Sequence, residues 1–187
     1  MRNSYVLTWS GRERSSHTNL YLCALFILYN YFMVEYQKKN MDLAYKEAQK
    51  AKSEDEVPVG CVIVKDGKIL AKAHNKKVCK NDATAHAEIE CIKKASKKLD
   101  SWRLDDCEMY VTLEPCLMCS GAIVNSRIKK VFFAAKDPKG GALVSNININ
   151  EIKNINHYPE VEYVESKECE QILKDFFKNK RKILPRQ

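Results

Sequence analysis

Metal-binding side chains stand at the starts of two predicted helices, and this feature constrains the fold more than any other. Cys116 and Cys119 form the only C-x-x-C pair of the chain, directly after Pro115. His86 stands at the start of an earlier predicted helix. Two thiols in a first helical turn point the same way, and the positive end of the helix lowers their pKa values. A fold that uses all three side chains must bring two helix N-termini together.

These side chains predict a catalytic metal site. Thiolate and neutral imidazole are the usual ligands of zinc, and three of them leave one tetrahedral position for water. Structural zinc sites normally have four protein ligands, so we expect one catalytic Zn²⁺ per chain, held by His86, Cys116 and Cys119. Glu88 lies two residues after His86 and is the expected proton carrier. A lone C-x-x-C also suits a thioredoxin-like redox protein, but His86 and Glu88 favour the metal.

Hydrophobic periodicity predicts an α/β fold from Met41 onward. Asp66-Gly67 lies between two apolar stretches, which predicts an antiparallel hairpin. The expected strands cover residues 59–64, 69–73, 109–113, 130–135 and 161–164. The expected helices cover residues 41–52, about 84–98, a segment from about 116, and about 166–182. This pattern contains neither an internal repeat nor a second domain.

Composition narrows the class of protein. The 187 residues have 45% hydrophobic content, which is enough for one core and excludes a disordered chain. A formal net charge of +8 favours polyanions such as nucleic acid. A chain with this core does not need a disulfide scaffold. We therefore expect the other cysteines to be reduced thiols: Cys23, Cys61, Cys79, Cys91, Cys107 and Cys169.

The first 40 residues follow a different pattern. Residues 20–34 are almost entirely apolar and follow two arginines, as in a secretory leader. The stretch is shorter than the roughly 20 residues that span a bilayer as a helix. Three hypotheses stay open: a secretory or organelle-targeting leader, a packed extra helix, or upstream sequence before a true start at Met33 or Met41. We divide the chain into an N-terminal extension (1–40), a catalytic domain (41–182) and a basic tail (183–187).

From Met41 to Lys182 the chain resembles the tRNA adenosine deaminases, which are zinc nucleobase deaminases with an H-x-E and a P-C-x-x-C motif. The matching blocks are Glu56–Gly60, Thr84–Ile89, Tyr110–Cys116, Ser126–Ile128 and Asp137–Ala142. The resemblance implies a cytidine-deaminase-like fold, a three-layer α/β/α sandwich with a mixed sheet of about five strands. It also implies that His86, Cys116 and Cys119 hold the zinc and that Glu88 is the proton shuttle.

The resemblance further implies where the substrate binds. Asn75 matches an asparagine that hydrogen-bonds the flipped base, Val59 matches a residue of the base pocket, and we expect Ala87 to contact the substrate as well. Asp137 and Lys139 match positions near the RNA backbone.

Two further RNA contacts are expected from residue type. Arg127 belongs to a basic run after the metal-binding helix, and Phe177 could stack on a base. Packing of Phe177 and a turn-capping role for Asn75 stay open as alternatives. The chain departs from the residues frequent in the family at His74, Ala83 and Asn125 and in the asparagine-rich residues 143–155.

The expected function is zinc-dependent hydrolysis of adenosine to inosine in tRNA, at the wobble position of the anticodon. Expected partners are the anticodon stem-loop and either a second copy of the chain or a related noncatalytic subunit, with no membrane partner for the catalytic domain. The expected location is intracellular, in the cytoplasm, or in an organelle if residues 1–40 are a targeting leader. Two alternatives stay open: a deaminase of a free nucleobase, nucleoside or nucleotide, and a noncatalytic zinc-containing RNA-binding subunit.

Overall fold

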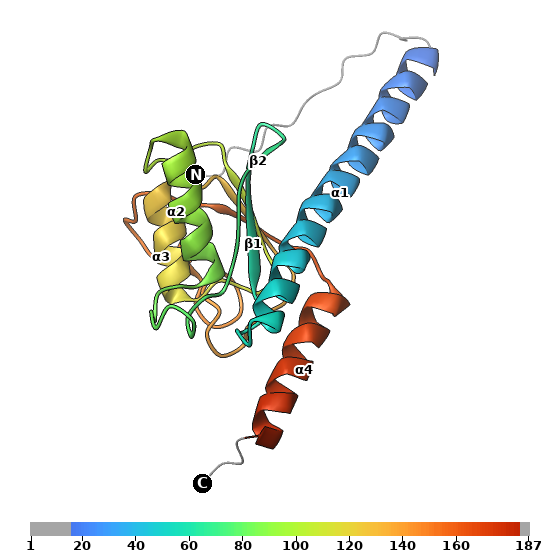
Figure 1. Ribbon diagram of the computed structural model, residues 1–187. Helices are drawn as coiled ribbons and strands as arrows, with labels where there is room; N and C mark the ends of the chain where they lie inside the picture. The colour runs from blue at the N-terminus through green and yellow to red at the C-terminus, as the bar shows by residue number, and fades with distance from the viewer. Residues whose placement is uncertain (1–15, 184–187) are drawn as a thin grey trace. The chain divides into compact units, whose positions relative to one another are not determined.

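Five strands form one mixed sheet in the computed structural model, which describes residues 16–183 (Figure 1). The strands are β1 (Gly60–Lys65), β2 (Lys68–His74), β3 (Glu108–Val111), β4 (Lys130–Phe133) and β5 (Glu160–Tyr163), in the order β2-β1-β3-β4-β5. β1 pairs antiparallel with β2 and β3, whereas β3, β4 and β5 run parallel. The predicted mixed sheet is confirmed.

The hairpin of β1 and β2 turns at Asp66 and Gly67. Their φ angles are 49° and 73°, and a two-residue type I′ turn requires positive φ at both positions. The hairpin prediction is confirmed, and the bounds of both strands lie within one residue of the expected ones.

Helices cover both faces of the sheet (Figure 1). α2 (Ala87–Leu99) and α3 (Leu117–Ser126) lie side by side on one face. α4 (Lys167–Ile183) lies on the other face, with residues 38–53 of α1 (Ser16–Ser53). A short 3-10 helix, η1 (Ile149–Glu151), lies between β4 and β5 along the chain. The predicted three-layer arrangement is confirmed.

The strand register places two helix starts at one edge of the sheet. Gly60 at the start of β1 pairs with His74 at the end of β2, and Cys61 pairs with Val111 at the end of β3. The segments that lead to α2 and α3 therefore leave the sheet at the same edge.

Side chains on both faces of the sheet are buried. Tyr110 and Phe132 stack with ring centroids 4.5 Å apart, and Ile63, Met109 and Val131 are fully buried. Strands covered on both faces have such apolar runs. This burial fixes the register, because a shift by one residue would exchange the side chains between the two faces.

α1 packs directly on the backbone of β1 at Gly60. Ala44 and Ala48 of α1 are fully buried and keep its surface flat at this point. A Cβ atom at residue 60 would lie 2.0 Å from the Ala44 carbonyl oxygen and 2.5 Å from the Ala48 nitrogen. The helix can lie this close to the strand only because residue 60 has no side chain.

The structure forms two compact units that divide between Gln37 and Lys38, within α1. Asn40 and Met41 are already buried, so the second unit begins a few residues before the predicted boundary at Met41. Residues 1–15 and 184–187 lie outside the described residues, as do the side chains of His17 and Cys23.

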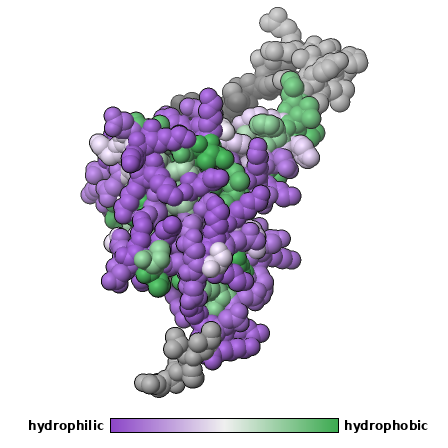
Figure 2. Space-filling view, viewed as in Figure 1, coloured by the Kyte–Doolittle hydropathy of each residue, from purple (hydrophilic) through white to green (hydrophobic). Residues whose placement is uncertain are grey.

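The part of α1 in the first unit exposes apolar side chains. They are Leu25, Phe26, Ile27, Leu28, Tyr29, Tyr31, Phe32 and Val34, and Figure 2 shows a green surface along the helix. None of the helices within residues 16–183 is both long enough and apolar enough to span a membrane. The three hypotheses for residues 1–40 stay predictions.

The cysteines whose side chains are described are all free thiols, as expected from the composition. Cys61, Cys91, Cys107 and Cys169 are buried, and Cys79 is exposed.

Gly60→Ala is expected to destabilise the domain, because the added methyl group would meet the backbone of α1 rather than a flexible side chain. Overpacking of this kind costs about 1–3 kcal/mol, and more where backbone must move. Thermal unfolding followed by circular dichroism measures the loss. Gly121→Ala is the matched control, because a Cβ atom there has no neighbour within 4 Å. Equal unfolding temperatures for the two variants would contradict the close packing at Gly60.

Candidate active site

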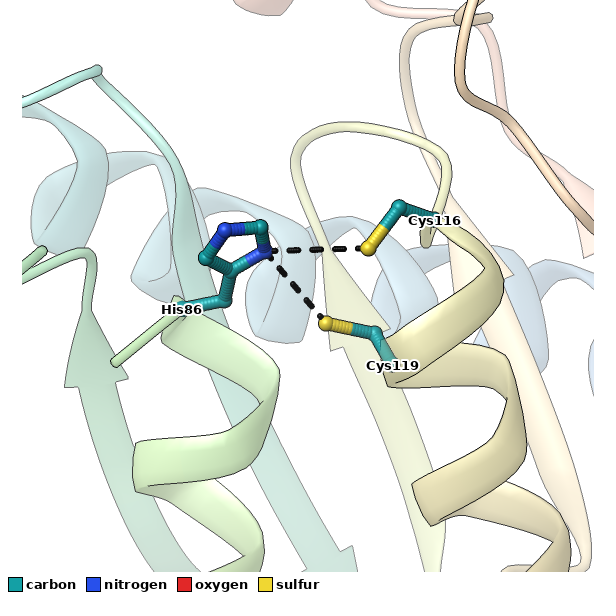
Figure 3. Close-up of side chains that lie close together, drawn as sticks. All are labelled: His86, Cys116 and Cys119. Carbon is teal, nitrogen blue, oxygen red and sulfur yellow. Dashed lines mark hydrogen bonds between the residues drawn. The ribbon is translucent and has the colours of Figure 1, made fainter. Parts of the chain in front are cut away.

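His86 and Cys116 each occupy the N-cap position of a helix. His86 precedes α2 with an extended backbone (φ −73°, ψ 156°), and Cys116 precedes α3 in a similar conformation (φ −73°, ψ 173°). Neither side chain caps its own helix. Figure 3 shows the His86 imidazole pointing from the start of α2 toward the Cys116 and Cys119 thiols at the start of α3.

The three ligand-type atoms fit a single tetrahedral zinc ion. Nδ1 of His86 lies 3.7 Å from Sγ of Cys116 and 3.6 Å from Sγ of Cys119. All three atoms lie within 4.8 Å of one another. A nitrogen and a sulfur at about 2.0 and 2.3 Å from one tetrahedral ion lie about 3.5 Å apart. The structure therefore brings the predicted trio together at distances that zinc coordination requires.

Hydrogen bonds within the trio shift the pKa values of the two thiols in opposite directions. The Cys119 thiol and the His86 ring lower the pKa of Cys116 to about 4, so Cys116 is a thiolate at neutral pH. The pKa of Cys119 is raised by its hydrogen bond to Cys116 and by burial. The pKa of His86 is raised chiefly by its hydrogen bond to the Cys116 sulfur. The trio thus presents an anionic sulfur, which is the form that binds metals.

Glu88 lies buried in the first turn of α2, beside the trio. Burial raises its pKa, because the carboxylate loses its contact with water. The neighbouring Cys119 side chain lowers this pKa, but the effect of burial is larger. A carboxyl group with a raised pKa can both take up and return a proton near neutral pH.

Asn75 is oriented by a buried carboxylate. Its Nδ2 donates to Oε2 of Glu56 at 2.9 Å, and the backbone N–H of Cys79 donates to Oε1 of Glu56 at 2.7 Å. Glu56 is fully buried, although it ends the charged stretch 53–56, which is typical of an exposed loop. Its place in a family-like block was the only sequence signal for this role.

A pocket of about 170 Å³ opens beside the trio. It is lined by these predicted site residues: Val59, Asn75, His86, Ala87, Glu88, Cys116 and Asp137. It is also lined by residues to which the sequence assigned no role: Val57, Lys77, Leu113 and Glu114. Pockets for drug-sized ligands measure roughly 300–1,000 Å³, so this pocket suits a single small ring system.

The predicted RNA contacts lie in three different places. Asp137 lines the pocket, and Lys139 is exposed two residues later, with its N–H donating to Oδ1 of Asp137 at 3.0 Å. Arg127 caps the opposite end of α3, where its guanidinium donates to the Val124 carbonyl at 2.8 Å. Phe177, on α4, is 46% exposed and is not among the residues that line the pocket.

Two other histidines hold structural contacts. His74, a departure from the family pattern, is buried. Its Nδ1 lies 3.1 Å from a carboxylate oxygen of Glu47, and its Nε2 lies 3.1 Å from a carboxylate oxygen of Glu54. Nε2 of His157 lies 2.6 Å from the Ile128 carbonyl oxygen. Both imidazoles therefore connect parts of the fold.

Comparisons with known proteins connect this site with deaminases. Residues 35–181 match the MafB19-like deaminase family. The tRNA-specific adenosine deaminase of Aquifex aeolicus is 48% identical over 75% of this chain and 93% of its own length. The tRNA-specific adenosine deaminase of Bacillus subtilis is 46% identical over 76% of this chain and 89% of its own length.

Solved structures show the same likeness. A structure from a study of A-to-I editing by tRNA A34 deaminases at the wobble position of transfer RNA has a TM-score of 0.71 and 41% identity, covering 73% of this chain and 99% of its own. The guanine deaminase of Bacillus subtilis has a TM-score of 0.53 and 32% identity, covering 80% of this chain and 96% of its own.

Zinc is expected to protect Cys116 and Cys119 together from alkylation, because one ion would bind both sulfurs. After chelation, iodoacetamide should label Cys116, which is half-buried, and reloading with Zn²⁺ should prevent the reaction. Peptide mass spectrometry measures the labelling. The exposed Cys79 is the internal control and should react in both states. Equal labelling of Cys116 with and without Zn²⁺ would argue against the proposed ligand set.

Proposed function

The chain belongs to the MafB19-like deaminases and, among them, to the tRNA-specific adenosine deaminases, and we propose on this basis that it hydrolyses adenosine to inosine in tRNA. One observation carries the proposal. Asn75 and the buried Glu88 line a small pocket beside the His86, Cys116 and Cys119 trio, in a chain 48% identical to a named tRNA-specific adenosine deaminase.

We assign one zinc ion per chain to His86, Cys116 and Cys119. The donor types and the nitrogen–sulfur distances of 3.6 and 3.7 Å support this assignment. When bound, zinc would act as a Lewis acid and lower the pKa of a water molecule to near neutral.

Glu88 is the catalytic acid and base in this proposal. Its carboxylate takes a proton from the attacking water and returns one to the amino group that leaves C6 of adenine. Water adds, ammonia leaves, and inosine remains, so the reaction needs no oxidant or reductant. The burial of Glu88 and its raised pKa support both proton transfers.

Asn75 and the pocket walls orient the base. Asn75 faces the pocket with its amide held by Glu56, so it can hydrogen-bond a base edge without reorganising. Val59, Ala87 and Leu113 supply apolar contacts for the faces of the ring.

The substrate nucleotide must leave its stack to enter a pocket of this size. Extruding a base costs less in a loop than in a duplex. We therefore propose the anticodon loop as the target and the wobble adenosine as the reacting nucleotide, the position named for the tRNA A34 deaminase study. The net charge of +8 supports a polyanionic substrate.

Asp137 and Lys139 are the proposed RNA contacts at the pocket. Arg127 and Phe177 stay predicted RNA contacts, and such contacts would involve parts of the tRNA other than the flipped nucleotide. A homodimer, or a heterodimer with a related noncatalytic chain, and an intracellular location complete the proposal. Light scattering of the purified protein tests the oligomeric state.

Inosine formation in an anticodon stem-loop RNA tests this function. Free guanine, adenosine and cytidine are the competing substrates, because the guanine deaminase of Bacillus subtilis shares the fold. Conversion of a free compound but not of RNA would replace the proposal with the free-compound alternative. Binding of the stem-loop without turnover would favour a noncatalytic subunit.

Glu88→Ala and Glu88→Gln are both expected to retain zinc and to lose activity by at least about 10²-fold, the scale of a general acid–base contribution. Glutamine keeps the shape of the side chain but cannot carry the proton. Zinc content by atomic absorption and single-turnover inosine formation are the measurements. Wild-type rates in Glu88→Gln would remove Glu88 from the proton transfers.

Lys139→Ala is expected to raise KM for the stem-loop and to lower the salt-dependence slope by about one, because one phosphate contact is lost. Lys72→Ala is the charge-matched control, because Lys72 is an exposed residue of the edge strand β2 and does not line the pocket. Titration of KM against salt concentration measures both variants. Indistinguishable slopes would contradict a specific contact at Lys139.

A further inference from the structure

On the basis of the tRNA deamination proposed above, we propose that Glu114 is a positioning residue. It joins the wall of the base pocket to the metal-binding turn, residues 115–119. Glu114 precedes Pro115 and Cys116 along the chain, is buried, and lines the pocket. Its carboxylate holds the loop of residues 137–145, which contains two of the proposed RNA contacts.

Five hydrogen bonds connect the Glu114 carboxylate to this loop. Oε1 accepts the backbone N–H groups of Leu143, Val144 and Ser145 at 3.2, 2.7 and 2.8 Å. Oε2 accepts the backbone N–H of Asp137 at 3.1 Å and also the Ser145 hydroxyl. One side chain therefore binds both ends of the loop.

These bonds depend on an acceptor with two oxygens. A buried carboxylate is costly unless its lone pairs are satisfied, and backbone N–H groups satisfy it without a cation. Four of the five donors belong to the backbone. The carboxylate can therefore hold the backbone of this loop largely whatever side chains the loop carries. The last residues of the loop, 143–145, are the first of the asparagine-rich stretch.

The same loop contacts the metal-binding turn directly. Cys116 and Gly141 form an isolated β-bridge, and the Ala142 N–H donates to the Pro115 carbonyl at 2.9 Å. A Cβ atom at Gly141 would lie 2.4 Å from Cδ of Glu114 and 2.7 Å from the Asp137 carbonyl oxygen. Loop, carboxylate and turn are thus packed without spare room.

This arrangement separates two parts of the site. His86, Cys116 and Cys119 are positioned by the first turns of α2 and α3. Asp137 is positioned by Glu114, whose Oε2 accepts its backbone N–H. Loss of the Glu114 bonds should therefore move the wall that meets the RNA more than it moves the metal ligands.

Glu114→Gln tests the inference. In either orientation, the glutamine amide places its NH₂ group, which is a donor, where a carboxylate oxygen accepted backbone N–H groups. Those N–H groups lose their acceptor, so at least one end of the loop is released. We expect KM for the stem-loop to rise at least about tenfold while kcat changes less than about threefold, with zinc content unchanged. Deuterium exchange of the backbone amides of residues 143–145 should become faster in the variant.

Gly141→Ala should reproduce the KM effect, because its methyl group would displace Glu114. Gly121→Ala is the matched control in α3, where a Cβ atom has no neighbour within 4 Å, and should leave KM and kcat at wild-type values. Ser145→Ala removes only the hydroxyl donor and serves if Glu114→Gln does not fold. It should raise KM by about threefold, the loss of one net hydrogen bond at the low end of its range.

The outcomes separate this inference from the proposed function. A wild-type protein that forms no inosine in RNA would refute the proposed function, whereas the amide exchange at residues 143–145 would still test the Glu114 connection. Unchanged exchange and unchanged KM in Glu114→Gln would overturn the inference. Loss of zinc from Glu114→Gln would also overturn it, because Glu114 would then act on the metal ligands.

Discussion

The antiparallel pairing of β1 with β3 is the constraint on which the site depends. It sets the start of β1 against the end of β3, and the β1–β2 hairpin sets the same point against the end of β2. The segments before α2 and α3 therefore leave the sheet at one edge. His86 and Cys116 then occupy two N-cap positions that face each other across this edge. A shift of the β1–β3 register by one residue would turn buried side chains to the opposite face and separate the trio.

Three buried glutamates belong to the site: Glu88 and Glu114 line the pocket, and Glu56 holds Asn75, which also lines it. Their neighbours give them different tasks. Glu56 accepts hydrogen bonds from Asn75 and Cys79, and it fixes an amide. Glu114 accepts hydrogen bonds from the Ser145 hydroxyl and from backbone N–H groups, which together outweigh the effect of burial and hold its pKa below the usual range. Glu88 is governed by burial, which raises its pKa. The same kind of side chain therefore orients an amide, anchors a loop or is suited to proton transfer, according to the donors that reach it.

The candidate metal ligands could be predicted from the sequence because their signal is local. A C-x-x-C pair and a histidine at helix starts are recognisable from spacing alone, and so is the Asp66-Gly67 hairpin. The roles of Glu56 and Glu114 could not be predicted, because their hydrogen-bond partners lie far along the chain. Only the folded loops bring each glutamate to its partners. Arg127 stays a predicted RNA contact, but it does not line the pocket. It follows Cys119 closely in sequence, but α3 carries it about 12 Å away from that residue, since a helix rises about 1.5 Å per residue.

The deaminase fold by itself does not decide the substrate, because a guanine deaminase shares it at a TM-score of 0.53. Zinc chemistry at the trio would serve either substrate, so discrimination must come from the walls of the pocket and from what lies at its mouth. Asn75 and Asp137 lie on walls that different carboxylates hold in place, Glu56 for one and Glu114 for the other. Neither carboxylate belongs to the trio, so the walls that meet the base and the metal-binding side chains are held by different contacts.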